Sequence, residues 1–210
     1  MVDVDPQPGG VCLHRGCIPS KTLLFLTELM YDAGRAEEMG IGFSRPRIDL
    51  DALRAWKSGV IDRLAGGLVT LSSKRGVQLV QAKATFESAD AVRLQGSEIT
   101  RFKFQHAILA TGSRPIALPG AGFREGGRVM DSTGALDLPD IPGALLIVGG
   151  GYIGLELGSV YASLGSRVTL VERGGQLLPG ADRDLAKPLL RRIAGSFTAI
   201  HLNTSVKAVE

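Results

Sequence analysis

The hydrophobic positions along the chain separate helical stretches from extended ones. Apolar residues recur every three or four positions over residues 49–75, beginning with Leu50 and Leu53. This spacing is typical of one face of an α-helix and predicts a helix there. Comparable helical patterns predict three more helices, over residues 19–39, 153–164 and 182–193.

Short apolar runs between turn signals indicate β-structure. Several of them fall within residues 77–104 and predict a small antiparallel meander. Residues 106–113 predict a buried strand that runs into a turn. Residues 144–148 are continuously apolar, as expected of a central parallel strand, and further strands are expected over residues 166–172 and 198–202. The alternation of strands and helices predicts an α/β fold with the meander attached to it.

Composition and charge narrow the possible classes of protein. The chain has 210 residues, of which 28 are glycine and 44% are hydrophobic, and this suits one or two α/β domains with real cores. The net charge is +3, and the basic residues are scattered, so no nucleic-acid partner is expected. The first residues do not form a signal peptide, and the apolar run over residues 141–155 is short for a membrane span. We expect a soluble protein of a reducing compartment, without a membrane partner.

The two cysteines of the chain, Cys12 and Cys17, lie just before the first predicted helix. Pro19 suits the first turn of a helix, so Cys17 is expected at or just before the helix N-terminus. The unpaired N–H groups and the macrodipole at that end would favour a thiolate at Cys17. A disulfide between the cysteines would require the backbone to leave the helical path, and Gly16 makes such a bend easy.

Three interpretations of the cysteine pair need weighing. A bridge over so short a loop constrains the unfolded chain little, which suits reversible opening and closing. A stapling disulfide is typical of small secreted domains, whereas this chain is long and has a single pair. A zinc site with Cys12, His14 and Cys17 would need a fourth ligand, and the sequence has no second Cys/His cluster to provide it. We therefore favour a redox-active disulfide and expect no metal site.

A glycine-rich turn follows the apolar run over residues 144–148. Its residues are Gly149, Gly150, Gly151, Tyr152, Ile153 and Gly154. They form the pattern Gly-x-Gly-x-x-Gly between a strand and a helix, and this context predicts a dinucleotide-binding unit. Gly149 permits the tight turn, Gly151 lets a pyrophosphate approach the backbone, and Gly154 allows helix and strand to pack closely.

An acidic residue, Glu172, ends the second strand of this unit. Its carboxylate should accept hydrogen bonds from the ribose hydroxyls and repel a 2′-phosphate, so NAD is expected rather than NADP. Glu156 lies early in the intervening helix, where an acidic side chain complements the helix dipole.

The segment from Gly9 to Lys21 reads Gly-Gly-Val-Cys-Leu-His-Arg-Gly-Cys-Ile-Pro-Ser-Lys. It closely resembles the active-site segment of the dihydrolipoyl dehydrogenases, a family of flavoprotein disulfide reductases, and the resemblance continues through almost the whole chain. The resemblance implies FAD and NAD as cofactors and an incomplete α/β fold of Rossmann-like FAD- and NAD-binding domains. Residues 1–115 would form part of the FAD-binding domain with the redox disulfide, and residues 116–210 the N-terminal part of the NAD-binding domain.

The resemblance also assigns flavin contacts. It places Lys21 near the flavin ring, where its charge favours the reduced isoalloxazine, although a solvated surface lysine is the usual outcome. The backbone at Ala84 would approach the adenine side of FAD. Thr111, Gly112 and Ser113 match the second flavin-contacting motif of the family.

Two further assignments concern NAD, and two concern the cysteines. Glu156 matches a family glutamate near the nicotinamide, and Val206 matches a position whose backbone contacts NAD. In the reaction that the resemblance implies, the substrate thiolate attacks Cys12, the more exposed sulfur. Cys17 then leaves as a thiolate that lies against the flavin.

The implied activity is the oxidation of dihydrolipoamide, carried on a lipoyl domain of a 2-oxoacid dehydrogenase complex, with NAD as acceptor. A homodimer is implied, in the bacterial cytoplasm or in the mitochondrial matrix of a eukaryote. A glutathione-type reductase would be a different member of the same class, although such enzymes usually differ at the Cys-Ile-Pro-Ser-Lys segment and at Glu172. The sequence is also compatible with a non-enzymatic dinucleotide-binding remnant, or with a thiol protein that does not use NAD.

The resemblance further implies that the sequence is truncated at both ends. The first flavin-binding unit and the C-terminal interface domain, with its catalytic His–Glu pair, are expected outside it. His14, His106 and His201 do not match that pair, so no general base is assigned. We expect the Asp-Val-Asp-Pro segment, residues 3–6, to be a frayed terminus. We also expect the isolated chain to have lost lipoamide turnover, and it could retain NAD affinity.

Overall fold

The computed structural model describes residues 1–44, 46–118, 120–123 and 126–209. The chain divides into two compact units. The first combines Met1–Ile18 with Ser58–Arg114, and the second combines Pro19–Lys57 with Pro115–Glu210. The predicted domains of residues 1–115 and 116–210 remain a prediction.

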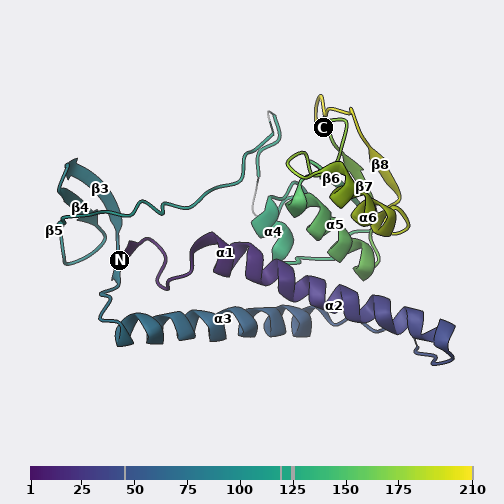
Figure 1. Ribbon diagram of the computed structural model, residues 1–210, viewed down its shortest axis with the longest axis horizontal. Coiled ribbons are helices and arrows are strands. Elements are labelled where there is room, and N and C mark those ends of the chain that lie inside the picture. Colours follow the sequence, from purple (N-terminus) through teal and green to yellow (C-terminus); the bar gives the residue numbers. More distant parts are fainter. Residues whose placement is uncertain (45, 119, 124–125, 210) are drawn as a thin grey trace. The chain divides into compact units, whose positions relative to one another are not determined.

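The first unit contains a small antiparallel sheet (Figure 1). Strand β3 (Lys83–Ser88) pairs with β4 (Ala91–Gln95), and β4 pairs with β5 (Arg101–Lys103), so the predicted meander is confirmed. A small apolar cluster lies beside these strands. It contains the buried residues Val80, Ala82 and Leu94, with Val2, Val92, Ile99 and Phe102 packed against them.

The N-terminus of the chain is not frayed, so that prediction is wrong. Strand β1 (Val2–Asp3) pairs in parallel with β2 (Val80–Gln81). The Met1 ammonium group donates a hydrogen bond to the Gln78 carbonyl oxygen at 2.6 Å. The backbone N–H of Ala82 also donates to the Asp3 carbonyl oxygen at 2.8 Å. These contacts join residues almost eighty positions apart, and local patterns do not reveal such pairings.

Four helical segments surround the cysteines and follow them. Helix α1 (Gly10–Arg15) ends just before Gly16, and α2 (Cys17–Arg35) begins directly after it. A 3₁₀-helix, η1 (Ala36–Met39), continues α2, and α3 (Leu50–Lys74) covers the predicted long helix. Cys17 is the first residue of α2, so its predicted place at a helix N-terminus is confirmed. Helix α1 was not predicted.

Residues 106–113 do not form the predicted buried strand. All residues from 105 to 118 are exposed, and Ile108 is 94% exposed. A strand is buried only when neighbouring strands pair with it and other elements cover its faces. Among the described residues, no strand pairs with residues 106–113. The apolar run is therefore compatible with a buried strand in composition but lacks the partners that would bury it.

The second unit contains the predicted α/β layer. Strands β6 (Ala144–Val148), β7 (Arg167–Val171) and β8 (Ala199–His201) form a parallel sheet in that order. Helix α5 (Tyr152–Leu164) connects β6 to β7, and α6 (Arg183–Ala194) connects β7 to β8 (Figure 1). This is the βαβ arrangement of Rossmann-like folds, so the predicted fold class is confirmed.

Strand β6 lies at the edge of this three-stranded sheet, whereas its apolar run predicts a central strand. Among the described residues, no strand pairs with the outer edge of β6, and Leu146 on one face of the strand is 57% exposed. The pattern fits a central position, but the described part of the chain supplies neighbours on one side only.

The main hydrophobic core belongs to the second unit. It forms where α5 packs on the sheet, and Tyr161, Val168 and Leu170 are completely buried there. Leu23 of α2 is also part of this core. The short helix α4 (Ser132–Leu136) joins it through Leu136. Within the described ranges, no helix is both long enough and apolar enough to cross a membrane.

Candidate functional site

The two cysteines form a disulfide across the junction of α1 and α2. Their Cα atoms lie 4.6 Å apart, whereas an unbroken helix would separate residues five apart by about 7.5 Å along its axis. The break at Gly16 brings them together. A Cβ atom at Gly16 would lie 3.0 Å from the Val11 carbonyl oxygen, so the close turn favours glycine at this position. Both cysteines are exposed.

Side chains between the cysteines bind the N-terminal segment. The Arg15 guanidinium donates hydrogen bonds to both oxygens of the Asp5 carboxylate, at 3.3 and 2.5 Å. The pKa of Asp5 is lowered, mainly by this side-chain hydrogen bond, and the pKa of Arg15 is raised by the same contact. His14 Nε2 lies 3.2 Å from the Pro8 carbonyl oxygen, to which it donates in the tautomer protonated at Nε2.

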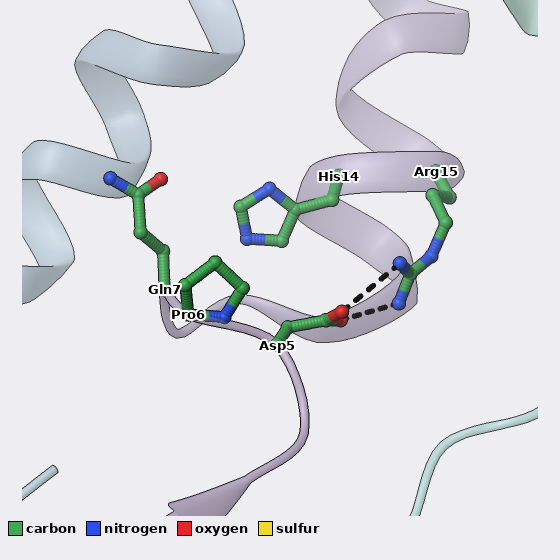
Figure 2. A pocket seen from close by; sticks show the side chains of 5 residues that line it. All are labelled: Asp5, Pro6, Gln7, His14 and Arg15. Carbon is green, nitrogen blue, oxygen red and sulfur yellow. Dashed lines mark hydrogen bonds and ion pairs between the residues drawn. The ribbon is translucent and has the colours of Figure 1, made fainter. Parts of the chain in front are cut away.

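A small open pocket adjoins this segment, with a volume of about 220 Å³. Its lining residues are Asp5, Pro6, Gln7, His14 and Arg15. Figure 2 shows the Asp5 carboxylate facing the Arg15 guanidinium, with the His14 ring on the same helix. The pocket therefore lies beside the turn that carries the disulfide.

The residues proposed for flavin binding lie on several elements. Ala84 lies on β3, opposite Leu94, and is exposed. Thr111, Gly112 and Ser113 lie in the exposed segment of residues 105–118. Gly112 has a φ of +76°, and a Cβ atom there would lie 3.8 Å from a methyl group of Val11. The turn at Gly112 thus lies next to α1, the helix that contains Cys12.

Lys21 and Glu156 are brought together in the second unit. Lys21 lies on the first turns of α2, and its ammonium group forms an ion pair with the Glu156 carboxylate of α5. The Lys21 side chain is 58% exposed, so the pair is accessible to solvent. Sequence reasoning placed one residue near the flavin and the other near the nicotinamide, and it did not predict their contact.

The glycine-rich turn joins β6 to α5. Gly149 has a φ of +110°, which favours glycine, and its N–H donates to the Val171 carbonyl oxygen at 2.9 Å. Gly151 is the N-cap of α5, and a Cβ atom there would meet nothing within 4 Å. A Cβ atom at Gly154 would lie 3.1 Å from Ile147 and even closer to the Gly149 carbonyl oxygen.

Gly150 has less room for a side chain than Gly149 and Gly151, the first two glycines of the motif. A Cβ atom there would lie 2.5 Å from Leu177 and 3.1 Å from the Cβ atom of Glu172. The motif treats this position as variable, so sequence reasoning missed the constraint. Only knowledge of which side chains fold over the turn reveals it.

The Glu172 carboxylate closes the other side of this turn. One oxygen accepts a hydrogen bond from the Gly150 N–H at 2.6 Å, and the other accepts from the Gly174 N–H at 2.6 Å. These bonds lower the pKa of Glu172, with the Gly150 contact as the largest cause. Glu172 thus connects the glycine turn to the loop after β7.

The remaining predicted nucleotide contacts surround this turn. Tyr152 and Ile153 are exposed in the first turn of α5, and Val206 lies half-buried in the loop after β8. An open N-terminus on a 13-residue helix, with no side chain at Gly151, suits the close approach of a phosphate group. The residues present therefore fit a dinucleotide.

A parallel βαβ unit with this turn, in a chain that also carries an exposed disulfide at a helix N-terminus, defines a class of dinucleotide-binding disulfide oxidoreductases. A family model described as pyridine nucleotide-disulphide oxidoreductase matches residues 1–210. The chain belongs to that family.

Individual relatives agree with this assignment. The dihydrolipoyl dehydrogenase of Vibrio cholerae is 45% identical over 203 residues, which cover 96% of this chain and 42% of that protein. That of Buchnera aphidicola is 41% identical over 212 residues, covering 100% of this chain and 44% of the relative. The HOCl-induced flavoprotein disulfide reductase RclA from Escherichia coli superimposes with a TM-score of 0.78 at 27% identity, covering 99% of this chain and 44% of that one. The chain spans less than half the length of these relatives.

Proposed function

We propose that this chain carries the redox disulfide and the NAD-binding unit of a dihydrolipoyl dehydrogenase. The Cys12–Cys17 disulfide, exposed at the N-terminus of α2, is the observation that carries the proposal. The exposure of both cysteines supports access by a thiol substrate. The relatives named dihydrolipoyl dehydrogenase support dihydrolipoamide as the substrate.

The chemistry at the cysteines is a thiol–disulfide exchange. A thiolate of dihydrolipoamide attacks Cys12 Sγ, the Cys12–Cys17 bond breaks, and the electron pair remains on Cys17 Sγ. The second thiol of the substrate then attacks the mixed disulfide and releases lipoamide. Two electrons have moved from the substrate to the cysteine pair, and the substrate protons go to solvent or to the Cys12 sulfur.

The position of Cys17 supports its role as the leaving thiolate. It is the first residue of a 19-residue helix, where the helix dipole stabilises negative charge. Exposure does not distinguish the two sulfurs, because both cysteines are exposed. The assignment of Cys12 as the attacked sulfur therefore rests on the helix position of Cys17.

The βαβ unit would hold NAD. The Gly151 backbone and the N-terminus of α5 would receive the pyrophosphate, and Glu172 would accept hydrogen bonds from the ribose hydroxyls. Two backbone N–H groups already hold the Glu172 carboxylate in place. Gly149 and Gly154 shape the turn, with Tyr152, Ile153 and Val206 around it.

FAD, when bound, would supply the two-electron relay between the cysteine pair and the nicotinamide. The residues we propose for it are Lys21, Ala84, Thr111, Gly112 and Ser113. The turn at Gly112 is exposed and lies next to Val11 in the helix of Cys12, which supports a flavin contact beside that helix. The ion pair with Glu156 holds the Lys21 side chain in one direction, and Glu156 is the proposed contact near the nicotinamide.

The proposed partners follow from the same substrate. We propose that dihydrolipoamide is presented by a lipoyl domain of a 2-oxoacid dehydrogenase complex and that the complete protein is a homodimer. The bacterial cytoplasm, or the mitochondrial matrix in a eukaryote, is the proposed location.

The rates at which two different thiols reduce the disulfide test the proposal. The oxidised chain is incubated with equal thiol concentrations of dihydrolipoamide and, separately, of glutathione. We expect dihydrolipoamide to reduce the disulfide faster, because its second thiol resolves the mixed disulfide within the same molecule. Cys17→Ser should abolish the reaction and leave NADH binding unchanged. Faster reduction by glutathione would favour a glutathione-type reductase, and no reduction by either thiol would contradict the proposal.

A further inference from the structure

The short turn between the two cysteines is held to the N-terminal segment by an ion pair between Arg15 and Asp5. Arg15 is the last residue of α1 and directly precedes Gly16, where the helix breaks. Its guanidinium contacts both oxygens of Asp5. The two side chains are partly buried, with 24% exposure for Asp5 and 41% for Arg15.

Asp5 is itself held in place. Its backbone N–H donates to the Asp3 carboxylate at 3.1 Å. Asp3 belongs to β1, which pairs with β2. A continuous series of contacts therefore leads from the β1–β2 ladder through Asp5 to Arg15, at the edge of the disulfide turn.

Opening the disulfide changes what this turn must accommodate. A covalent S–S bond is about 2.05 Å long, and two separate sulfur atoms need considerably more space. Gly16 is the flexible point between the cysteines, so the end of α1 is expected to move on reduction. A contact that fixes Arg15 opposes this movement and keeps the two sulfurs at a high effective concentration.

We propose that the Asp5–Arg15 ion pair positions the disulfide turn and makes the Cys12–Cys17 disulfide harder to reduce. This inference rests on the proposed redox function of the cysteines and adds a positioning pair to it. The half-reaction is the addition of two electrons and two protons to the disulfide, which gives two cysteine thiols. A dithiol such as dithiothreitol supplies both and becomes a cyclic disulfide.

The charge of Arg15 acts in the same direction as the anchoring. With Asp5 present, the cation is neutralised by its partner. Without Asp5, an unpaired guanidinium would lie two residues from Cys17, where it would stabilise the thiolate of the reduced form. An aspartate is already ionised at neutral pH, and the hydrogen bond with Arg15 lowers the pKa of Asp5 further, so the anchoring is present there.

The experiment is a redox titration of the whole chain in dithiothreitol buffers, with free thiols counted at each ratio. In Asp5→Asn and Arg15→Ala the equilibrium should shift toward the reduced form by about two- to fivefold, a range typical of partly exposed ion pairs. Asp5→Asn should shift it further than Arg15→Ala, because it also leaves the cation unpaired. Arg15→Lys, which keeps a cation opposite Asp5, should restore most of the wild-type value.

Glu87→Gln is the matched control. Glu87 also forms an ion pair, with Arg93 at 2.5 Å, and the Glu87 side chain is 22% exposed. This pair lies on the meander of the same unit, away from the disulfide turn in the sequence. Its substitution should leave the redox equilibrium unchanged within the error. The thermal stability of all variants is measured in parallel, since a purely structural role would lower the stability without shifting the equilibrium.

The outcomes separate this inference from the function on which it rests. A reversible wild-type couple with a shift in both pair variants, and none in Glu87→Gln, supports the inference. A reversible wild-type couple that is unchanged in Asp5→Asn and Arg15→Ala overturns the inference alone, and so does an equal shift in Glu87→Gln. The absence of a reversible couple in the wild-type chain overturns the proposed function and the inference together.

Discussion

At the residue scale, the three consecutive glycines of the proposed nucleotide-binding turn are glycine for different reasons. Gly149 adopts a left-handed conformation, with a φ of +110°. Gly150 has no room for a side chain because Leu177 lies over it. Gly151 has room, and only a ligand would fill it. In neighbouring positions of one motif, glycine is thus required for folding at one and for the proposed binding at another.

Substitution of Gly150 and Gly151 by alanine tests this separation. Gly150→Ala should destabilise the chain by about 1–3 kcal/mol, because the added methyl group overpacks against Leu177. Gly151→Ala should change the stability by less than about 0.5 kcal/mol. It should nevertheless weaken NADH binding, because its methyl group blocks the approach of the pyrophosphate. Urea unfolding and a fluorescence titration with NADH give the two values. The steric account fails if Gly150→Ala is as stable as wild type.

Glu172 combines a structural role with a proposed binding role. Its carboxylate holds the Gly150 and Gly174 N–H groups, and its folded-state pKa lies below the usual value of 4.5. A carboxylate with a lowered pKa contributes stability above pH 4.5. This contribution is lost as the pH falls below 4.5 and through the folded-state pKa.

Glu172→Gln should therefore remove the acid-sensitive contribution of this residue. The variant should be less stable than wild type at pH 7, and the difference should shrink as the pH falls below 4.5. Urea unfolding at several pH values measures this. Glu38→Gln is a suitable control, since the Glu38 side chain is 73% exposed. A stability difference between Glu172→Gln and wild type that does not change with pH would refute the assigned role of the charge.

At the element scale, local signals predicted the βαβ unit well. The glycine turn, the continuous apolar strand and the acidic strand end each depend on neighbouring residues, and β6, α5 and β7 formed where they were predicted. Helix α3 follows its 3.6-residue periodicity in the same way.

Elements that depend on distant partners were not predicted. The sequence does not show that β1 pairs with β2, because these strands lie almost eighty residues apart. Residues 106–113 have the composition of a buried strand but no described partner. The Asp5–Arg15 pair had no signal in the sequence, because its residues are common surface types whose meeting depends on how the chain folds back between Asp5 and α1.

The packing of α4 against α5 gives a prediction at this scale. The buried Tyr161 hydroxyl donates to the Ala135 carbonyl oxygen at 2.9 Å, and burial raises the pKa of Tyr161 to about 12. Tyr161→Phe should cost about 1 kcal/mol at pH 7, the usual net value of one hydrogen bond. Its stabilising effect in wild type should be complete below pH 10 and should be lost between pH 10 and 12.

Denaturation from pH 7 to pH 12 measures this effect. The wild-type chain should lose stability more steeply above pH 10 than Tyr161→Phe does. Tyr31→Phe serves as the control, because Tyr31 is 48% exposed and phenylalanine keeps its ring opposite Arg192. Parallel alkaline curves for wild type and Tyr161→Phe would contradict the assigned role of the hydroxyl.

At the scale of the whole molecule, the chain, a member of one oxidoreductase family, combines a disulfide turn with a proposed dinucleotide-binding turn. The disulfide turn is held by the first unit, and the dinucleotide turn by the second. Each part has its own local geometry, so each can be tested separately. The proposed exchange reaction at the cysteines needs no nucleotide, and the proposed NADH binding needs no thiol chemistry.

A single-turnover reaction of the oxidised chain with excess dihydrolipoamide tests the central claim most directly. Lipoamide is measured, and the new thiols are located by alkylation and peptide mapping. We expect about one lipoamide and two new thiols per chain, at Cys12 and Cys17, and none in Cys12→Ser. A chain that yields no lipoamide, although its disulfide is intact and exposed, would contradict the assignment of Cys12 and Cys17 as the dithiol-oxidising pair.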